Sequence, residues 1–215
     1  HMERGKLELF ICVTLCHFHY LFIDKVYTLG MIITIAGMPG SGKTSVRDLL
    51  AERLHLKKYS VGDFMRELAK KEGITLVDLG KRGETDPSVD KTLDDYQVEL
   101  GKKEDNFILD SRLGFHFVPH SIKIFLKCDF GVGAQRIFDQ GRTREQFAET
   151  TSSVEELEEN LKKRVESEHT RYNKYYGVKQ YDNANYDFVI DTSSISVEET
   201  ADKIVEFIEG RQGGD

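Results

Sequence analysis

Short runs of apolar residues alternate with longer amphipathic segments along most of this 215-residue chain. Five of the runs have the length and the β-branched or aromatic character of strands. They cover residues 31–37, 57–61, 107–110, 122–127 and 188–191. Between the runs, apolar residues recur at the spacing of one helix face, as Val46, Leu49, Leu50 and Leu54 do. The main helices are predicted over residues 44–54, 88–101, 131–140, 153–176 and 197–210.

This alternation favours an α/β fold with a parallel sheet and helices on both faces. Ligands of such folds bind at the carboxyl ends of the strands. The length suits one α/β domain with room for inserts. From residue 63 onward the chain is expected to be helical, with Gly73, Gly80 and Gly83 breaking it into short helices.

The first thirty residues do not follow this pattern. His1-Met2 looks like a remnant of cloning, and residues 9–23 form an apolar run that is short for a membrane span. Met31 opens directly into the first predicted strand. We therefore expect residues 3–30 to be an upstream extension of unassigned role rather than a membrane anchor.

Composition narrows the class of protein. The hydrophobic fraction of 39% and the charged fraction of 31% are those of a globular protein. A net charge of −7 argues against binding of nucleic acid polymers, but small phosphate ligands need only a few local cations. The three cysteines, Cys12, Cys16 and Cys128, do not form a disulfide framework, which favours the reducing cytoplasm. Cys12, Cys16, His17 and His19 match no common zinc spacing, so no metal site is expected there.

The strongest motif joins the first predicted strand to the helix after it. Residues 37–44, GMPGSGKT, match G-x-x-x-x-G-K-[ST] at every fixed position. Glycines let successive N–H groups point at phosphate oxygens, and the helix N-terminus adds positive charge. Lys43 is predicted to reach the β- and γ-phosphates of ATP, and the Thr44 hydroxyl to ligate Mg²⁺. The predicted ATP-binding residues are Gly37, Met38, Pro39, Gly40, Ser41, Gly42, Lys43, Thr44 and Ser45. The strand–loop–helix context disfavours a chance glycine-rich turn.

The residues after the third predicted strand favour phosphoryl transfer over hydrolysis. A motor ATPase usually carries a glutamate beside its magnesium aspartate, whereas Asp110 is followed by Ser111 and Arg112. An arginine suits an anionic acceptor better than it suits the activation of water. Asp110 is predicted to hold Mg²⁺ through water, with a strand-end cap as the alternative role. A GTPase is disfavoured because no N-K-x-D motif follows a later strand.

Several segments resemble nucleoside monophosphate kinases. Residues 60–66, SVGDFMR, are similar to their S-x-G-[DE]-x-x-R segment, and residues 110–112, DSR, to the strand end that supplies a second phosphate-holding arginine. The segments RVESEHTRY (164–172), YYG (175–177) and YDFVIDTS (186–193) resemble the archaeal type of cytidylate kinase. Asp90, Asp94 and Gln97 lie where that family approaches the acceptor base. The resemblance runs from Met31 to about Gly210.

The resemblance implies a three-layer P-loop fold with five parallel strands, an acceptor-binding insert over about 61–103 and a lid over about 138–172. It implies that Ser60, Gly62, Arg66 and Arg112 seat the acceptor's phosphate and that Asp94 and Gln97 face its base. Arg136 would stack on the adenine of ATP, or simply be an exposed helix residue. The lid arginines of the family do not align clearly with this chain, so Arg142 and Arg144 are weaker candidates than Arg136, Arg164 and Arg171.

The predicted catalytic residues are Lys43, Arg112, Arg164 and Arg171. Arginine forks meet phosphate oxygens two at a time, and Arg164 and Arg171 are two helical turns apart, so they share one helix face. Taken alone, this charged segment also fits a solvated helix in which Glu168 pairs within the helix. The phosphate loop and Arg66 favour the catalytic interpretation.

The sequence therefore predicts phosphoryl transfer from MgATP to a nucleoside monophosphate, with CMP or dCMP as the expected acceptor. One alternative is a P-loop kinase for another small acceptor, such as AMP, UMP or dephospho-coenzyme A. A second is a nucleotide-binding regulatory factor with low turnover, and a third is a membrane-tethered protein, supported by residues 9–23 alone. We expect a cytoplasmic monomer that binds neither membranes nor nucleic acid polymers, with a short tail over 211–215.

Overall fold

The computed structural model describes residues 30–140 and 153–212. The segment 9–23 and the group Cys12, Cys16, His17 and His19 lie outside the described residues, as do Arg142 and Arg144 within the predicted lid. From Ile32 onward, the described chain belongs to one compact unit. No helix among the described residues is long and apolar enough to cross a membrane.

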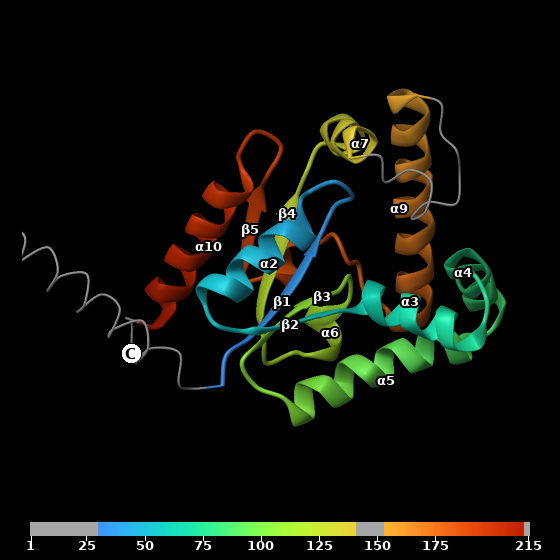
Figure 1. Cartoon of the computed structure of the whole chain (residues 1–215), viewed down its shortest axis with the longest axis horizontal. Helices are drawn as coiled ribbons and strands as arrows, with labels where there is room; N and C mark the ends of the chain where they lie inside the picture. The colour runs from blue at the N-terminus through green and yellow to red at the C-terminus, as the bar shows by residue number, and fades with distance from the viewer. Residues whose placement is uncertain (1–29, 141–152, 213–215) are drawn as a thin grey trace, which may run out of the picture. The chain divides into compact units, whose positions relative to one another are not determined.

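Five parallel strands form one sheet in the order β2-β3-β1-β4-β5 (Figure 1). The strands are β1 (Ile32–Gly37), β2 (Lys57–Ser60), β3 (Phe107–Asp110), β4 (Ile122–Lys127) and β5 (Phe188–Asp191). The central strands are apolar along their length because helices cover both faces, and Ile33, Ile108 and Ile124 are fully buried. The predicted fold class is confirmed.

The helices lie close to their predicted positions. They are α2 (Lys43–Arg53), α3 (Val61–Glu72), α4 (Leu76–Thr85), α5 (Pro87–Lys103), α6 (Gly114–Phe117), α7 (Phe130–Asp139), α9 (Val154–Tyr176) and α10 (Val197–Gln212), with a short 3-10 helix at Asn183–Asn185. Helices α2 and α10 pack together on one face of the sheet (Figure 1). On the other face, Leu100 of α5 and Val118 after α6 pack against Ile32, Phe107 and Leu109.

Two small apolar clusters lie beyond the main core. Within the predicted insert, Ala69, Leu79 and Val89 of α3, α4 and α5 pack together. In the second cluster, residues of α7 pack against Leu157 and Leu161 of α9. Each cluster gives its helices a local core. The exact bounds of insert and lid stay a prediction.

The structure differs from the sequence prediction at a few element ends. Val61 begins α3 instead of ending β2, because the Ser60 hydroxyl accepts the N–H of Asp63 and caps the helix. Gly73 ends α3 with φ 68°, as expected. Gly80 and Gly83 were predicted to break helices, but both lie inside α4. Helix α10 extends to Gln212, two residues into the predicted tail.

Candidate active site

The phosphate loop lies between β1 and α2, and contacts with α7 fix its course. Gly40 and Gly42 have φ values of 71° and 83°, which favour glycine. A Cβ built on Gly40 would lie 2.3 Å from Cα of Gly133 in α7, and a Cβ on Gly133 would lie 2.5 Å from the carbonyl oxygen of Pro39. Glycines on both sides of this contact therefore let the loop rest directly on the helix backbone.

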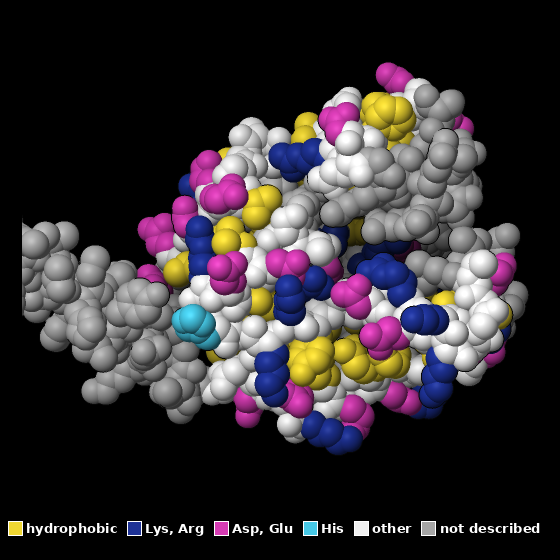
Figure 2. All heavy atoms as spheres, in the orientation of Figure 1, with side chains coloured by type: hydrophobic (Ala, Val, Ile, Leu, Met, Phe, Trp, Pro, Cys, Tyr) yellow, Lys and Arg dark blue, Asp and Glu magenta, His cyan; other side chains and the backbone are white. Residues whose placement is uncertain are grey.

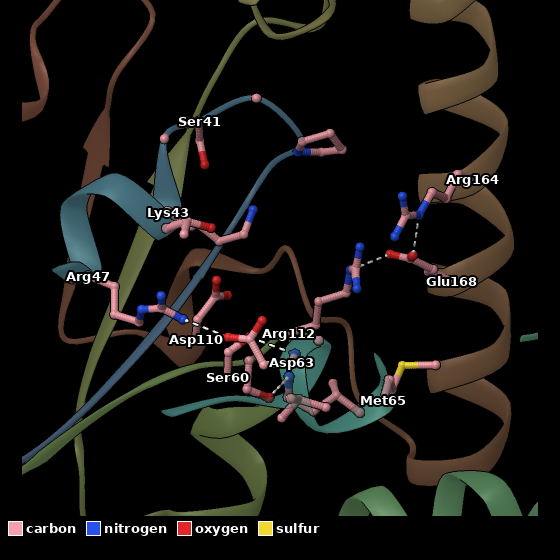
Figure 3. A pocket seen from close by; sticks show the side chains of 18 of the residues that line it. Ser41, Lys43, Arg47, Ser60, Asp63, Met65, Asp110, Arg112, Arg164 and Glu168 are labelled. Atoms are coloured by element: carbon pink, nitrogen blue, oxygen red, sulfur yellow. Dashed lines mark hydrogen bonds and ion pairs between the residues drawn. The ribbon is translucent and has the colours of Figure 1, made fainter. Parts of the chain in front are cut away.

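Lys43, the first residue of α2, points back into the loop (Figure 3). Its Nζ donates to the carbonyl oxygens of Gly37 and Met38, each at 3.0 Å. Burial lowers the pKa of Lys43 to about 8, although the negative charge of Asp110 opposes this shift. Thr44 and Ser45 follow in the first turn of α2 and are exposed. The Ser41 hydroxyl oxygen is buried without a hydrogen-bond partner in the described chain.

The carboxyl ends of three strands bring the donor and acceptor segments together. Asp110 at the end of β3 is in register with Ile35 of β1 and with Ser60 of β2. The phosphate loop leaves β1 two residues after Ile35, and α3 starts directly after Ser60. This edge of the sheet therefore carries the phosphate loop, Asp110 and the predicted acceptor segment side by side.

Three arginines predicted to be catalytic line the cavity at this edge, one after β3 and two on α9. Arg112 follows β3, and its Nε lies 2.8 Å from Oε2 of Glu168. Arg164 lies on α9, with its Nε 2.9 Å from Oε1 of the same glutamate (Figure 3). Arg171 lies two turns beyond Arg164 on α9, where its guanidinium packs 5.2 Å from the centre of the Tyr172 ring. The intrahelical pairing of Glu168 foreseen from the sequence is present, and Arg112 joins it from another element.

The carboxylate of Glu168 lies between Arg112 and Arg164, and this arrangement determines the pKa shifts of the cluster. Burial would raise the pKa of Glu168, but Arg112 and Arg164 hold it below its usual value. Arg112 itself lowers the pKa of Arg164, and burial adds to this effect. The group therefore keeps a net positive charge toward the phosphate loop, which suits a site for anionic groups.

On the acceptor side, residues of α3 lie opposite the arginines. Arg66 forms an ion pair with Asp63, whose other carboxylate oxygen lies 3.5 Å from Nη1 of Arg47. A Cβ on Gly62 would lie 3.5 Å from the Ser60 hydroxyl, which is an ordinary contact, so nothing in the described protein demands glycine there. The space beside Gly62 would let a ligand come close to the backbone, which a side chain at this position would prevent.

Two residues of α5 were predicted to face the acceptor base. Asp94 accepts a hydrogen bond of 2.8 Å from the Tyr176 hydroxyl of α9, and burial raises its pKa to about 6. Gln97 is buried, donates to the carbonyl oxygen of Leu93 and accepts from the Ser111 hydroxyl. Gln97 thus also supports the strand end that carries Arg112.

Arg136 of α7 is held against the phosphate loop. Its Nη2 donates to the carbonyl oxygens of Thr192 at 2.8 Å and Ser193 at 3.2 Å, and its Nη1 to that of Gly40 at 3.4 Å. Arg136 therefore ties the loop to the chain after β5. Its predicted stacking on adenine stays a prediction.

One cavity of about 660 Å³ contains nearly all of these groups, a volume suited to small-molecule ligands. Figure 2 shows Lys and Arg side chains gathered around the hollow in this face. Of the predicted site residues, Gly37 and Met38 do not line the cavity. Those that do are Pro39, Gly40, Ser41, Gly42, Lys43, Thr44, Ser45, Ser60, Gly62, Arg66, Asp94, Gln97, Asp110, Arg112, Arg136, Arg164 and Arg171.

Two further cavity residues were missed as site residues by the sequence reasoning. Glu168 was considered only as a partner within its own helix. Arg47 is 6% exposed and lines the cavity from α2. Arg47 is three residues before Leu50 and seven before Leu54, so the helical spacing places it on the buried face of α2, and this is the signal that could have identified it. A charge is rarely buried unpaired, and Arg47 has Asp48 at 2.7 Å and Asp63 at 3.5 Å as its acidic partners.

Fold and site together define a P-loop phosphotransferase. A phosphate loop with its lysine faces three arginines across a cavity at the carboxyl edge of a parallel sheet. The chain belongs to the cytidylate kinase-like family, whose sequence model matches residues 32–194.

Individual proteins agree with this assignment. The chain is 36% identical over 163 residues to a cytidylate kinase of Methanococcoides burtonii, covering 76% of this chain and 88% of that protein. It is 37% identical over 172 residues to a cytidylate kinase of Methanospirillum hungatei, covering 80% and 92%. Among solved structures, shikimate kinase from Acinetobacter baumannii in complex with shikimate superposes with a TM-score of 0.57 at 20% identity, covering 88% of this chain and 98% of that one. That likeness concerns the fold alone.

Proposed function

We propose that this protein transfers the γ-phosphoryl group of MgATP to CMP or dCMP, forming the nucleoside diphosphate and ADP. The single observation that carries the proposal is the cavity, in which Lys43 and the arginines Arg66, Arg112, Arg164 and Arg171 surround one space. Family membership supports the choice of a nucleoside monophosphate as acceptor.

In this reaction an oxygen of the acceptor's phosphate forms a bond to the γ-phosphorus, while the bond from that phosphorus to the β–γ bridging oxygen breaks. Negative charge spreads over the equatorial oxygens of the transferred group. Lys43 and the phosphate-loop N–H groups would hold the donor phosphates. Arg66 and Arg112 would hold the acceptor's phosphate. Arg164 and Arg171 would stabilise the negative charge on the transferred phosphoryl group in the transition state.

The residues at the loop also fit Mg²⁺. The described chain contains no cluster of three or more acidic, histidine or cysteine side chains that could hold a metal alone. This agrees with Mg²⁺ held by substrate phosphates and waters with one or two protein groups. Thr44 would ligate the ion directly and Asp110 through water. When bound, Mg²⁺ would neutralise charge on the β- and γ-phosphates.

For the acceptor base, Asp94 is the best placed of the predicted residues. An ionised carboxylate only accepts hydrogen bonds, so Asp94 would accept one from the exocyclic amino group of cytosine. The Tyr176 hydroxyl already holds one Asp94 oxygen and so fixes the direction of the other. Gln97 would contribute from the same helix.

The proposal includes closure of the insert, about 61–103, and of the lid, about 138–172, to exclude water before transfer. It also includes a monomer in the cytoplasm. The low cysteine content supports this location.

The test is a coupled assay of ADP formation from MgATP with CMP, dCMP, UMP, AMP, GMP or dephospho-coenzyme A, and without acceptor. Turnover led by CMP or dCMP is expected, and Arg66→Ala should raise KM for the acceptor more than KM for ATP. Turnover led by another acceptor would replace the substrate and keep the mechanism. ATP binding without acceptor-dependent ADP would refute the proposal in favour of a regulatory protein.

A further inference from the structure

Glu168 is a buried acidic residue in the cavity wall, beside the arginines proposed to hold phosphate groups. Its side chain is 11% exposed, whereas those of Arg112 and Arg164 are 37% and 38% exposed. A carboxylate at this place would repel phosphate groups if it acted on the ligand directly. Its role must therefore lie in what it does to the arginines.

The contacts with Glu168 join two different parts of the protein. Arg112 is fixed to the end of β3, and Arg164 lies one turn before Glu168 on α9. Both contacts use the arginine Nε, at 2.8 Å and 2.9 Å, and each takes a different oxygen of the carboxylate. In Figure 3, Glu168 lies between the two arginines on the side away from Lys43.

The charges also show why a shared carboxylate matters. Two guanidinium groups this close repel each other, as the lowered pKa of Arg164 beside Arg112 indicates. One carboxylate between them offsets that repulsion while leaving a surplus positive charge. Arginine side chains have several rotatable bonds, and fixing them before the ligand binds lowers the entropy that binding and transfer must overcome.

We propose that Glu168 is a positioning residue that holds Arg112 and Arg164 as one unit at the cavity, so that Arg112 meets the acceptor's phosphate and Arg164 the transferred phosphoryl group. The inference rests on the proposed phosphoryl transfer and adds a residue to it. The negative charge of Glu168 weakens the attraction of the cavity for phosphate. Its two carboxylate oxygens in return fix the orientation of Arg112 and Arg164 that transfer requires.

A purely structural ion pair makes a different prediction. If Glu168 only stabilised the fold, replacing it would lower thermal stability, anion affinity and turnover together. If it positions the arginines, the neutral Glu168→Gln variant should bind anions more tightly because its two arginines are no longer compensated, yet transfer more slowly. The proposal therefore predicts that anion affinity rises while the rate of transfer falls.

The experiment compares Glu168→Gln and Glu168→Asp with wild type. Glu166→Gln is the matched control, because Glu166 is exposed on the same helix. The measurements are kcat, KM for both substrates, inhibition by sulfate, and the shift of the melting temperature by sulfate alone. For Glu168→Gln we expect kcat to fall on the order of 10-fold or more, sulfate to inhibit several-fold more strongly, and KM for the acceptor not to rise. Glu166→Gln should match wild type throughout.

Several results would overturn the inference. One is a kcat for Glu168→Gln within about twofold of wild type; another is sulfate affinity that is unchanged or weaker. If the glutamine variant does not fold, Glu168→Asp decides, because it keeps the charge but shortens the reach. It should lower kcat with little change in sulfate affinity, and wild-type kcat would refute positioning. The sulfate-induced melting shift needs no turnover, so it tests Glu168 even if the acceptor assay fails in wild type.

Discussion

The close contact between the phosphate loop and α7 predicts how replacement of Gly133 by alanine affects stability and activity. Gly133 lies inside α7, where alanine is normally the better helix former by about 1 kcal/mol. Gly133→Ala should nevertheless impair the protein, because the new Cβ would lie 2.5 Å from the carbonyl oxygen of Pro39. Contacts of this kind essentially never come closer than 3.0 Å, so the loop has to move by at least about 0.5 Å.

The neighbours at this contact are backbone atoms, which cannot rotate out of the way. Overpacking of this kind costs roughly 1–3 kcal/mol, enough to cancel or exceed the gain in helix propensity. The displaced loop carries the N–H groups proposed to hold the donor phosphates. Because displacements of about 1 Å at such sites can cost about 100-fold, kcat/KM for ATP should fall roughly 10-fold or more.

The assay measures kcat/KM for ATP at saturating acceptor together with the melting temperature. Gly210→Ala in α10 is the matched control, since a Cβ there meets no atom within 4 Å. It should raise the melting temperature by about 2–4 °C and leave kinetics unchanged. Gly133→Ala with wild-type kcat/KM for ATP and the same rise in melting temperature would refute the reasoning about the loop.

Three further predictions concern single groups in the cavity. Because burial raises the pKa of Asp94 to about 6, kcat/KM for the acceptor should fall as pH drops through about 6 and Asp94 takes up a proton. The acceptor's phosphate has its second pKa at about 6 as well, so Asp94→Asn should show a shallower fall, and an unchanged profile would contradict the assignment. Burial lowers the pKa of Lys43 to about 8, so kcat/KM for ATP should fall above about pH 8 as Lys43 loses its proton. The Lys43→Arg variant stays charged, so its remaining kcat/KM for ATP should not decline in that pH range. Gly62→Ala should melt within about 2 °C of wild type, because its Cβ has room, yet raise KM for the acceptor by roughly 10-fold; an unchanged KM would mean that no ligand approaches this backbone.

The fold was predictable to a large extent because its signals are local. Buried parallel strands are continuous apolar runs, and the fixed spacing of the phosphate loop defines both the end of β1 and the start of α2. The errors lie where a local rule competes with context. The sequence predicts helix breaks at Gly80 and Gly83, but α4 continues through both residues. A Cβ built on Gly83 would lie 3.5 Å from the Val89 side chain of α5, so this glycine faces the neighbouring helix.

The site was predictable only in part because its contacts are long-range. The sequence motifs identified Lys43, Arg66 and Arg112 through their neighbours in the chain. The partnership of Arg112 with Glu168 joins residues far apart in sequence, and only the packing of α9 beside the end of β3 reveals it. Likewise, the buried Arg47 pairs with its neighbour Asp48 at 2.7 Å and with Asp63 of α3 at 3.5 Å. The contacts of Arg112 with Glu168 and of Arg47 with Asp63 each join two elements, and no local motif in the sequence indicates either of them.

The central claim is transfer of a phosphoryl group to cytidylate rather than hydrolysis of ATP. The most direct measurement follows the label of [γ-³²P]ATP after incubation with Mg²⁺ and CMP, with separation of CDP, ATP and inorganic phosphate. The account predicts that the label appears in CDP, that little appears as inorganic phosphate, and that omission of CMP leaves it in ATP. Label released as inorganic phosphate, or label that stays in ATP when CMP is present, would contradict it.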